Sequence, residues 1–584
     1  MNAPCRAAAR RLLAVLCLAV LPAAAAPRRE VPDFNLTDIF GRNYRLQAAE
    51  GRAVVLIFTG VGCPAARKTV PKLHDLRAKF GADVQFWLVN SYAGDSLRDC
   101  RKEFGEVGAY PLPYLRDTRQ TVALAFGIQR TTEAVAVSTD DWQVFYQGAV
   151  DDQLAPGGER AEAQANPLAD ALTAFLAGQP VKLAKTAAKG CRITYAAPAE
   201  AAEAPTYAAH VAPLLKQHCV ECHRDGGIGP FAFDGYARAK NYARMIEEVV
   251  VAQRMPPWGA DPDFGKFAHV PVLSTEEAQT LIRWVQSGAP RGEGEDLLAA
   301  GLAPAPAWRL GTPDAVMRLP DVQHVPATGV QDYRMVGIPS PFTNEVWVSG
   351  FDVQPGNRAV VHHVILYAKW PGSGDGPIGK GIHLAGWAPG TPPYRYPAGA
   401  AKRIPAGAEF TAELHYTTTG TAATDQTEIA FYLAPGPQAH DVETRFAWTQ
   451  HIDLPPGSDN VPHSAVYGFQ RPALLYTLAP HMHMRGAWMK YELLTPDGKR
   501  RTLLHVPRYD FKWQHVYELA EPLRVPAGAW LYVTGGFDNS KKNLNNPEPG
   551  KRVTEGEQSW DEMFIGFFDA ADVPEEGKSV AAAR

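Results

Sequence analysis

The hydrophobic pattern of this 584-residue chain changes its period twice. From about residue 31 to 194, apolar runs typical of buried strands alternate with apolar positions at helical spacing. Residues 207–292 keep the helical spacing, whereas from 307 to about 571 short runs of period two are separated by Gly and Pro. The pattern predicts a multidomain chain: an α/β domain, a small all-α domain, and then two all-β sandwiches.

The N-terminal residues and two stretches of linker composition set the expected boundaries. Residues 1–26 combine three arginines with an apolar run and small residues, which predicts a cleaved signal peptide and a periplasmic or secreted protein. No later apolar run is long enough to span a membrane. The expected segments are a signal peptide at 1–26, an α/β domain at 27–195, a linker at 196–206, an all-α domain at 207–292, a linker at 293–306, and two sandwiches at 307–440 and 441–575.

The charge of the chain narrows the choice of partners. Lys and Arg number 58 against 62 Asp and Glu, which gives a net charge of −4. The sequence shows no basic stripe, so we expect neither nucleic acid nor an anionic membrane surface as a partner.

A haem attachment motif opens the all-α region. Residues 219–223 read CVECH, in which Cys219 and Cys222 can form two thioethers to a porphyrin while His223 reaches the iron. Such haems are attached to exported proteins, which agrees with the predicted signal peptide. The motif therefore predicts one covalently bound haem c, and the alternative is a disulfide loop with an idle histidine.

The sixth haem ligand is expected on a proline-rich loop about 30 residues further on. Met255 precedes two prolines there, and this loop resembles the distal loop of small cytochromes c. Met245 and His269 are the rival ligands. A helix that starts with a capping box of Ser274 and Glu277 should close the domain.

The α/β region carries a candidate thiol site. The run at 53–59 (AVVLIFT) predicts a buried strand, and a helix should follow Cys63-Pro64. Cys63 would then lie at a helix N-terminus, where the helix dipole lowers a thiol pKa. Outside the signal peptide and the CxxCH motif the chain has only two other cysteines, Cys100 and Cys191, so one disulfide and one free thiol are possible.

This region resembles the thioredoxin-like redoxins over about 160 residues. It departs from them at Ala66, where the oxidoreductases carry a resolving cysteine, and at residues 130–132 (RTT), where a cis-proline is usual. Two interpretations stay open. Cys63 is structural, or it has a one-cysteine redox role in which Cys100 or Cys191 resolves it.

Histidines in strand-like contexts mark the β region. His481 and His483 stand two residues apart, so on a strand both rings point to the same face and can bind one metal ion, with Met482 and Met484 on the other face. Adjacent histidines point to opposite faces, so His362 and His363 can share a metal only at a bulge or bend. The remaining candidate is His415, and the other histidines of the region are interpreted as structural or surface residues.

Four motifs of the β region resemble, in order, the copper type II, ascorbate-dependent monooxygenases, which include the peptidylglycine α-hydroxylating and dopamine β-monooxygenases. They are VVHHVILYA, ELHYTTTG, PHMHMRG and WDEM. The resemblance implies one copper site of His362, His363 and His415 and a second of His481, His483 and Met563. A thioether ligand selects Cu(I), so Met563 also favours copper.

Together with the predicted signal peptide and haem, the resemblance predicts an exported copper-dependent monooxygenase with two copper ions. It would hydroxylate a C–H bond with O2 at the site of His481, His483 and Met563, and take electrons through its own haem from ascorbate or a periplasmic reductant. The alternatives are a haem and copper electron carrier, a copper-holding protein, or a thiol redox protein based on Cys63. The amidating branch of the family binds a peptide carboxylate with polar residues, where this chain has Ala479, Ile565 and Phe567, so we expect a small neutral substrate.

Overall fold

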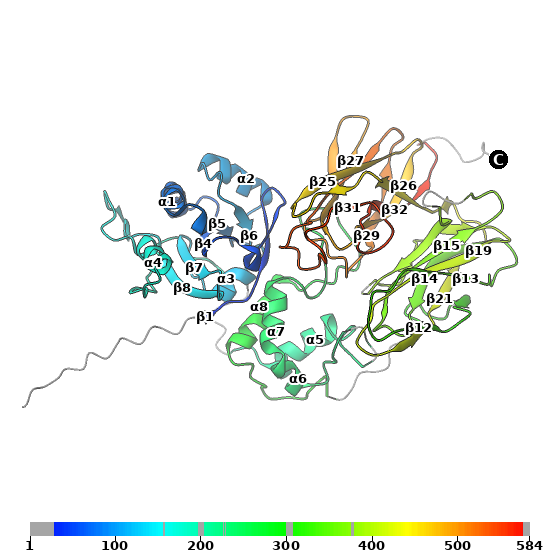
Figure 1. Ribbon diagram of the computed structural model, residues 1–584, viewed down its shortest axis with the longest axis horizontal. Helices are drawn as coiled ribbons and strands as arrows, with labels where there is room; N and C mark the ends of the chain where they lie inside the picture. The colour runs from blue at the N-terminus through cyan, green and yellow to red at the C-terminus, as the bar shows by residue number, and fades with distance from the viewer. Residues whose placement is uncertain are drawn as a thin grey trace, which may run out of the picture.

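The computed structural model describes residues 29–155, 158–196, 204–225, 227, 229–299, 308–374, 379–389 and 391–575. The predicted signal peptide lies outside these residues, as does most of the first predicted linker. Four folded regions follow one another along the chain (Figure 1). Among the described residues, no helix combines the length and the apolar character that a membrane crossing needs.

The N-terminal domain is an α/β domain built on an eight-stranded sheet in the order β1-β8-β7-β4-β5-β6-β2-β3. The run at 53–59 forms β4 (Ala53–Thr59), as predicted, and all seven of its residues are buried. Strand β4 pairs in parallel with β5 and antiparallel with β7, so it lies inside the sheet. The helices are α1 (Pro64–Phe80), α2 (Leu97–Glu106), α3 (Thr121–Phe126) and α4 (Pro167–Leu176); the other strands are β1 (Arg29–Glu30), β2 (Asn35–Asp38), β3 (Asn43–Arg45), β5 (Val84–Asn90), β6 (Tyr114–Arg116), β7 (Glu133–Ser138), β8 (Gln143–Ala149), β9 (Leu154–Ala155) and β10 (Gly158–Glu159).

A helical domain follows the N-terminal domain. Its last helix begins with the predicted capping box, in which Ser274 Oγ accepts the Glu277 N–H and the Glu277 carboxylate accepts the Ser274 N–H. Trp284 on the same helix is fully buried. The helices are α5 (Ala212–His218), α6 (Tyr236–Asn241), α7 (Ala243–Val251) and α8 (Thr275–Gln286), preceded by a single turn at Tyr207–Val211.

The N-terminal and helical domains share one hydrophobic core. Phe126 and Ile193 of the first belong to the same buried cluster as Val211, Ile282 and Trp284 of the second. Across this contact, Nε2 of Gln279 donates to the Arg119 carbonyl, 3.1 Å away. The two regions are therefore packed together as one unit.

The first half of the β region is a sandwich whose two sheets share one core. One sheet has the order β11-β21-β14-β18-β22, with β17 beside β14, and the other has the order β13-β19-β15-β16. Phe431 of the first sheet and Leu366 and Leu414 of the second lie in the same cluster. The strands are β11 (Ala315–Arg318), β12 (Gln323–Val325), β13 (Arg334–Ile338), β14 (Val346–Gln354), β15 (Val361–Lys369), β16 (Ile382–Trp387), β17 (Tyr394–Arg395), β18 (Ala400–Ile404), β19 (Glu409–Tyr416), β20 (Ala423–Asp425), β21 (Glu428–Leu433) and β22 (His440–Asp441).

The second half is another sandwich, with sheets β23-β32-β26-β29 and β25-β30-β27-β28. Leu475 and Phe568 of one sheet pack with Tyr491 and Val533 of the other. The period-two pattern thus gave the correct architecture for both halves. The strands are β23 (Glu443–Thr449), β24 (Asp453–Leu454), β25 (Val461–Gly468), β26 (Ala473–His481), β27 (Gly486–Leu494), β28 (Arg500–Val506), β29 (Tyr517–Val525), β30 (Trp530–Phe537), β31 (Val553–Thr554) and β32 (Phe564–Asp572).

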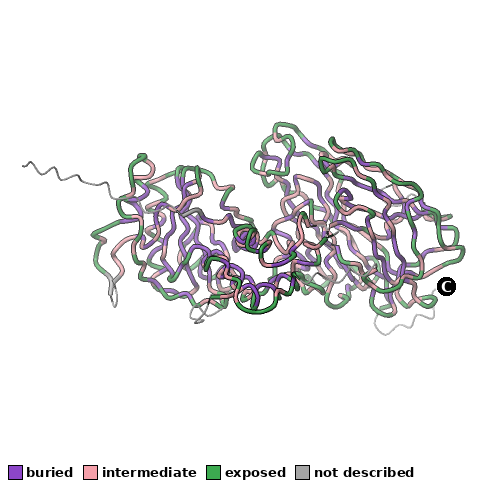
Figure 2. The backbone as a smooth tube through the Cα atoms, turned by 90° about the horizontal axis from the view of Figure 1, so that it is seen from below, coloured by how far each residue is buried: buried purple, intermediate pink, exposed green. Residues whose placement is uncertain are grey.

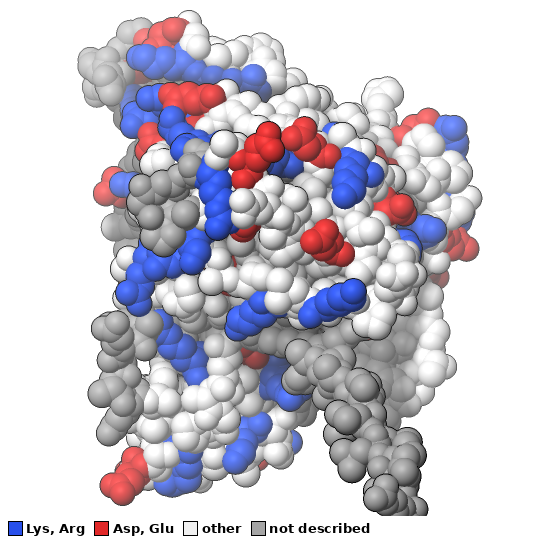
Figure 3. Space-filling model, turned by 90° about the vertical axis from the view of Figure 1, so that its left-hand side faces the viewer, with Lys and Arg blue, Asp and Glu red and all other residues white. Residues whose placement is uncertain are grey.

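Buried residues occupy the interior of each lobe, and exposed residues follow the outer loops (Figure 2). On the face at the N-terminal-domain end, Lys and Arg side chains are spread among uncharged and acidic residues (Figure 3). This face agrees with the near balance of 58 basic and 62 acidic residues. A loop of the helical domain also packs on the second sandwich, because Trp258 and Phe267 join that core and Phe267 bridges to Leu519.

Candidate functional site

The histidines His362, His363 and His415 converge on one point. The first two lie on β15 and the third on β19, where it is paired directly opposite His363. The register between these strands shifts between Val361 and His363, so the sheet has the irregularity that adjacent histidines need to face the same side. Ring nitrogens of the three residues all lie within 4.8 Å of one another. The geometry fits three ligands of one metal ion.

These three rings are neutral at physiological pH. Burial lowers the pKa of His362 to about 4 and that of His415 to about 3. Burial and the neighbouring histidines lower the pKa of His363 well below its ordinary value. Nδ1 of His415 is buried and has no hydrogen-bond partner among the described residues. A neutral imidazole with an unused ring nitrogen is the form that binds a metal.

His481 and His483 form a second pair at the end of β26. Their ring centroids are 5.3 Å apart. Nδ1 of His481 lies 2.7 Å from Gln514 Oε1, and Nδ1 of His483 lies 3.3 Å from the carbonyl oxygen of Asp561. Engagement of Nδ1 leaves Nε2 of each ring available as a ligand. Met482 between them is fully buried in the sandwich core, as the alternation of strand faces predicts.

The segment that carries Met563 is held against this pair by Glu562, a residue whose role the sequence reasoning missed. The Glu562 carboxylate accepts the backbone N–H of His483 at 2.9 Å and that of Arg485 at 2.6 Å. Glu562 is completely buried, and its carboxylate lies 3.8 Å from the Arg485 guanidinium. The half-buried Met563 is its direct neighbour in the chain. The glutamate therefore fixes the turn after His481 to the start of β32.

The two histidine groups lie close together, and the Phe511 ring contacts a histidine of each. Its centroid is 4.8 Å from that of His362 and 5.9 Å from that of His483. The groups are close enough for the charge of His483 to lower the pKa of His363. Sequence reasoning gave Phe511 no role, because only the fold brings it between strands that are distant in the chain.

A cavity of about 690 Å³ is lined by residues of both sandwiches and of the helical domain. His363 and His481 line it on one side, and Cys222 of the CxxCH motif lines it on the other. His383 and His515, interpreted from the sequence as structural, line the same cavity. Both carry a buried ring nitrogen without a hydrogen-bond partner among the described residues. The spacing of His383 and His515 in the sequence does not predict that they line a cavity.

The residues of the CxxCH motif fit a covalent haem. Cys219, Cys222 and His223 follow α5, and Nδ1 of His223 lies 3.2 Å from the Phe231 carbonyl, which leaves Nε2 for the iron. Phe231 and Phe233 pack on the imidazole with ring centroids 4.7 and 5.4 Å away. Burial raises the pKa of Cys219 to about 12, so this thiol stays protonated. An apolar wall and a ligand with a fixed tautomer suit a haem pocket.

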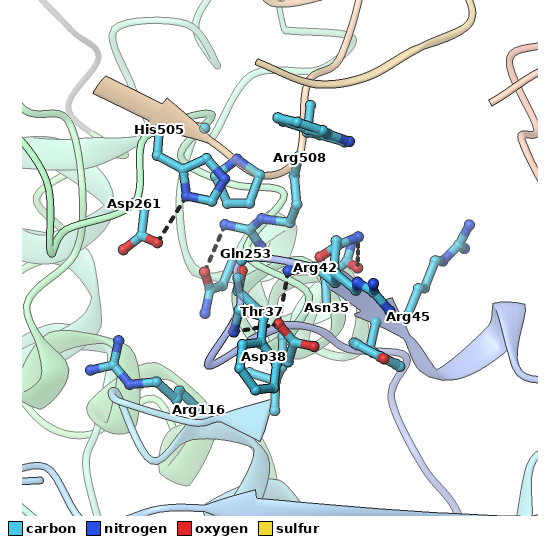
Figure 4. A pocket seen from close by; sticks show the side chains of 18 of the residues that line it. Asn35, Thr37, Asp38, Arg42, Arg45, Arg116, Gln253, Asp261, His505 and Arg508 are labelled. Atoms are coloured by element: carbon cyan, nitrogen blue, oxygen red, sulfur yellow. Dashed lines mark hydrogen bonds and ion pairs between the residues drawn. The ribbon is translucent and has the colours of Figure 1, made fainter. Parts of the chain in front are cut away.

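The expected sixth ligand, Met255, lines a different cavity from Cys222. That cavity, of about 1070 Å³, lies where the N-terminal domain, the helical domain and the second sandwich meet. Asp38 and Arg116 of the N-terminal domain face Arg508 of the sandwich across it (Figure 4). The rival ligand His269 lines the cavity of Cys222, and Met245 is 47% exposed. The choice of ligand stays a prediction.

Cys63 caps the N-terminus of α1, as predicted, and is 5% exposed. Its Sγ lies 3.0 Å from Cys191 Sγ and 3.1 Å from Thr131 Oγ1. Burial alone would raise the pKa of the Cys63 thiol, but its hydrogen bonds with Cys191 and Thr131 outweigh this effect, and the pKa lies below its ordinary value. Cys100 is buried on α2, and its pKa is raised by burial to about 11. Of the two candidate partners of Cys63, the structure places Cys191 beside it.

A known protein family matches the N-terminal domain of the chain. The AhpC/TSA family matches residues 27–144. The chain carries a redoxin domain. No curated protein matches the chain. The redoxin domain occupies the region in which the sequence resembles the thioredoxin-like redoxins.

Solved structures similar to the chain cover about a third of it or less. An uncharacterized conserved protein of Geobacillus kaustophilus is 28% identical, with 30% of this chain and 93% of that chain covered and a TM-score of 0.27. A hypothetical protein of Sinorhizobium meliloti is 24% identical, with 30% and 98% covered and a TM-score of 0.27. A secreted disulfide oxidoreductase of Mycobacterium tuberculosis is 18% identical, with 19% and 79% covered and a TM-score of 0.17.

Proposed function

We propose that this chain is an oxidoreductase whose redoxin domain carries out thiol redox chemistry at Cys63. The observation that carries the proposal is the setting of Cys63 at the N-terminus of the 17-residue helix α1, with two hydrogen-bonding groups on its sulfur. The thiolate is the nucleophilic form of cysteine, and this setting favours it. The match of residues 27–144 to the AhpC/TSA family supports the same function.

Two turnover assays test this function. The purified protein is offered a disulfide-bonded protein in one assay and a hydroperoxide in the other, with dithiothreitol as reductant. The Cys63→Ser variant should lose the activity that the wild type shows, and the Cys100→Ser variant should keep it because Cys100 is a protonated core residue. Equal activity of wild type and Cys63→Ser in both assays would refute a thiol function at Cys63.

Two groups of histidines that lie close together favour a second function for the β region. We propose that His362, His363 and His415 hold one copper ion, and that His481 and His483 with Met563 hold another, in a copper-dependent monooxygenase. Five neutral, buried imidazoles on two facing sandwiches are costly to the fold unless they serve as ligands. The thioether of Met563 favours copper over zinc.

The copper ions, when bound, would supply the two electrons that hydroxylation of a C–H bond by O2 takes besides those of the substrate. The residues of the chain orient the ligands. Gln514 and the Asp561 carbonyl hold the two imidazoles by Nδ1, and Glu562 fixes the turn that carries them. Phe511 places an apolar ring between the two groups.

We propose a haem c at Cys219, Cys222 and His223 as the internal electron relay. The support is the cavity of about 690 Å³, because Cys222 lines it together with His363 and His481. An external donor such as ascorbate or a periplasmic reductant would reduce the haem. The predicted signal peptide supports a periplasmic or secreted location.

The part of the cavity next to His481 suits a small, neutral substrate, although Arg224, Arg309 and Arg358 also line the cavity. Ala479 and Phe567 line it next to His481, and neither offers a charge to a carboxylate. Lys402 also lines it, but its Nζ is already paired with Asp569 at 3.3 Å. The Arg485 side chain is 1% exposed and donates to Asn539 and the Trp560 carbonyl, so it is not free for a substrate.

Labelled oxygen tests the monooxygenase function. The haem is reduced anaerobically, copper is added, and labelled O2 is admitted with neutral aromatic or aliphatic compounds or with glycine-extended peptides. We expect label in a product of a neutral compound, no conversion of the peptides, and no labelled product from any compound with His415→Ala. Haem reoxidation without any labelled product would instead indicate an electron carrier.

A further inference from the structure

The segment after the redoxin fold lies across the Cys63 site. The Thr131 N–H donates to the Cys191 carbonyl at 2.9 Å, and the Ile193 N–H donates to the Gln129 carbonyl at 2.9 Å. An antiparallel bridge joins Arg130 and Arg192 between these two bonds. Residues 190–195, which we call the cover segment, therefore pair with the chain next to Cys63 as a short strand would.

Several further contacts hold the cover segment in place without any bond between the sulfurs. The Cys191 N–H donates to Thr131 Oγ1 at 2.8 Å, and Tyr92 Oη donates to the Arg192 carbonyl at 2.7 Å. Ile193 is buried in the core shared with the helical domain. Gly190 approaches Thr131 so closely that a Cβ would lie 2.0 Å from the Thr131 carbonyl oxygen. The position of Cys191 is thus fixed by the fold.

The two sulfurs differ in exposure and in charge. Cys63 is buried beneath the cover segment, whereas Cys191 is exposed. The two sulfurs lie 3.0 Å apart, and the interaction between them lowers the pKa of Cys63 and raises that of Cys191. Thr131 Oγ1 accepts the Cys191 N–H, which leaves its own proton for the Cys63 sulfur. An incoming thiol can therefore reach Cys191 more easily than Cys63.

We propose that Cys63 and Cys191 form a reversible disulfide in which Cys191 receives the external reductant and Cys63 is the leaving group. This inference rests on the proposed thiol function. The sulfurs lie 3.0 Å apart, and a covalent S–S bond of about 2.05 Å needs only a small approach. Cys63 leaves readily because a thiolate of lowered pKa is the better leaving group.

The exchange balances with an external dithiol as the reductant. One thiolate of the reductant attacks Cys191 Sγ, the Cys63–Cys191 bond breaks, and its electron pair leaves with Cys63 as thiolate. The second thiol of the reductant then attacks its own sulfur in the mixed disulfide and releases Cys191, which takes up a proton. The reductant becomes a disulfide, and the protein gains two electrons as a dithiol.

The experiment uses the full-length protein and a monothiol that cannot complete the second step. The protein is oxidised with excess oxidised dithiothreitol and digested without reduction, and we expect the Cys63 peptide linked to the Cys191 peptide in wild type and in Cys100→Ser. A disulfide between Cys63 and Cys100, or none involving Cys63, would overturn the pairing.

The oxidised protein is then treated with glutathione, quenched with acid and mapped. Glutathione should be found on Cys191 in at least tenfold excess over Cys63, and the same ratio is expected in Cys100→Ser. Glutathione mainly on Cys63 would overturn the assigned direction and leave the thiol function of Cys63 standing. Loss of turnover in Cys63→Ser, measured separately, decides that function, so the two failures are distinguishable.

Discussion

Among single residues, burial lowers the pKa of each of the five histidines proposed as copper ligands. The folded protein keeps His362 and His481 neutral until their pKa of about 4, whereas an unfolded histidine binds a proton near pH 6.5. Between these values the unfolded state holds more protons than the folded state. Stability must therefore fall as the pH falls through this range.

The pH dependence of unfolding gives the first prediction. Each such histidine should contribute at most about 1.4 kcal/mol per pH unit between pH 6.5 and 4. Urea unfolding of the metal-free protein, followed by Trp fluorescence, should give a free energy of unfolding that drops from pH 6.5 to 4. His362→Asn should show a shallower slope, and an equal slope would contradict the neutral ring at this position.

Of the two cysteines of the thiol site, only the position of Cys63 could be predicted from the sequence. Cys63 at a helix N-terminus followed from a buried strand, a turn and apolar positions at helical spacing, all of them local features. Cys191 is 128 residues away, and its pairing with Cys63 depends on backbone bonds to Thr131 that no local pattern contains. The sequence therefore left Cys100 and Cys191 as equal candidates.

The turn after β26 is held by the buried side chain of Glu562, which lies just before β32 and far away in the sequence. Burial raises the pKa of Glu562 to about 8, so its main role at neutral pH is to accept the N–H groups of His483 and Arg485. Replacement of Glu562 by Ala would leave both buried N–H groups unpaired, at a cost of about 1–3 kcal/mol each. The histidine pair of this turn should lose its geometry before the three-histidine group does.

Copper titration gives the second prediction. Wild type should bind about two copper ions per chain, and Glu562→Ala about one, retained by His362, His363 and His415. The matched control is Glu557→Ala, whose carboxylate side chain is 61% exposed, and it should bind as wild type does. Two copper ions in Glu562→Ala would show that the turn does not need the glutamate.

X-ray absorption of the copper-loaded, reduced protein gives the third prediction. Met563 follows Glu562 directly, so it is positioned beside the turn of His481 and His483. Sulfur scattering at copper should vanish in Met563→Ile while nitrogen scattering persists. If sulfur scattering is unchanged, Met484 becomes the candidate ligand, because Met482 is buried in the sandwich core.

The strand pattern predicted the two sandwiches and that the histidines lie on strands. It did not predict the local irregularities that bring the ligands together. The alternation around His362 and His363 placed the two rings on opposite faces of a regular strand. The register shift that changes this arises from pairing with β19, a long-range feature. The Phe511 ring between the two groups likewise comes from a loop that period and spacing do not place.

At the scale of the whole molecule, the redoxin and helical domains behave as one folding unit because they share a core. Ile282 on α8 is fully buried there with Phe126 of α3. Truncation of such a residue to Ala costs about 2–5 kcal/mol. The linker composition of residues 196–206 predicted two separate domains. It could not predict that apolar faces of these two domains pack against each other.

Hydrogen exchange gives the fourth prediction. Ile282→Ala should lower protection in α3 of the redoxin domain as well as in α8, and leave the sandwiches unchanged. Leu366→Ala, in the core of the first sandwich, serves as the control and should lower protection only in the β region. A loss confined to the helical domain in Ile282→Ala would contradict the shared unit.

An activated Cys63 thiolate should be visible in the pH dependence of its alkylation. The reduced full-length protein is treated with iodoacetamide from pH 5 to 10, and modification of Cys63 is followed by mass spectrometry. We predict a midpoint below the ordinary thiol pKa of about 8.5, an upward shift in Thr131→Val, and no large shift in Thr131→Ser. A midpoint at or above pH 9 in the wild type would show that Cys63 is not an activated thiolate.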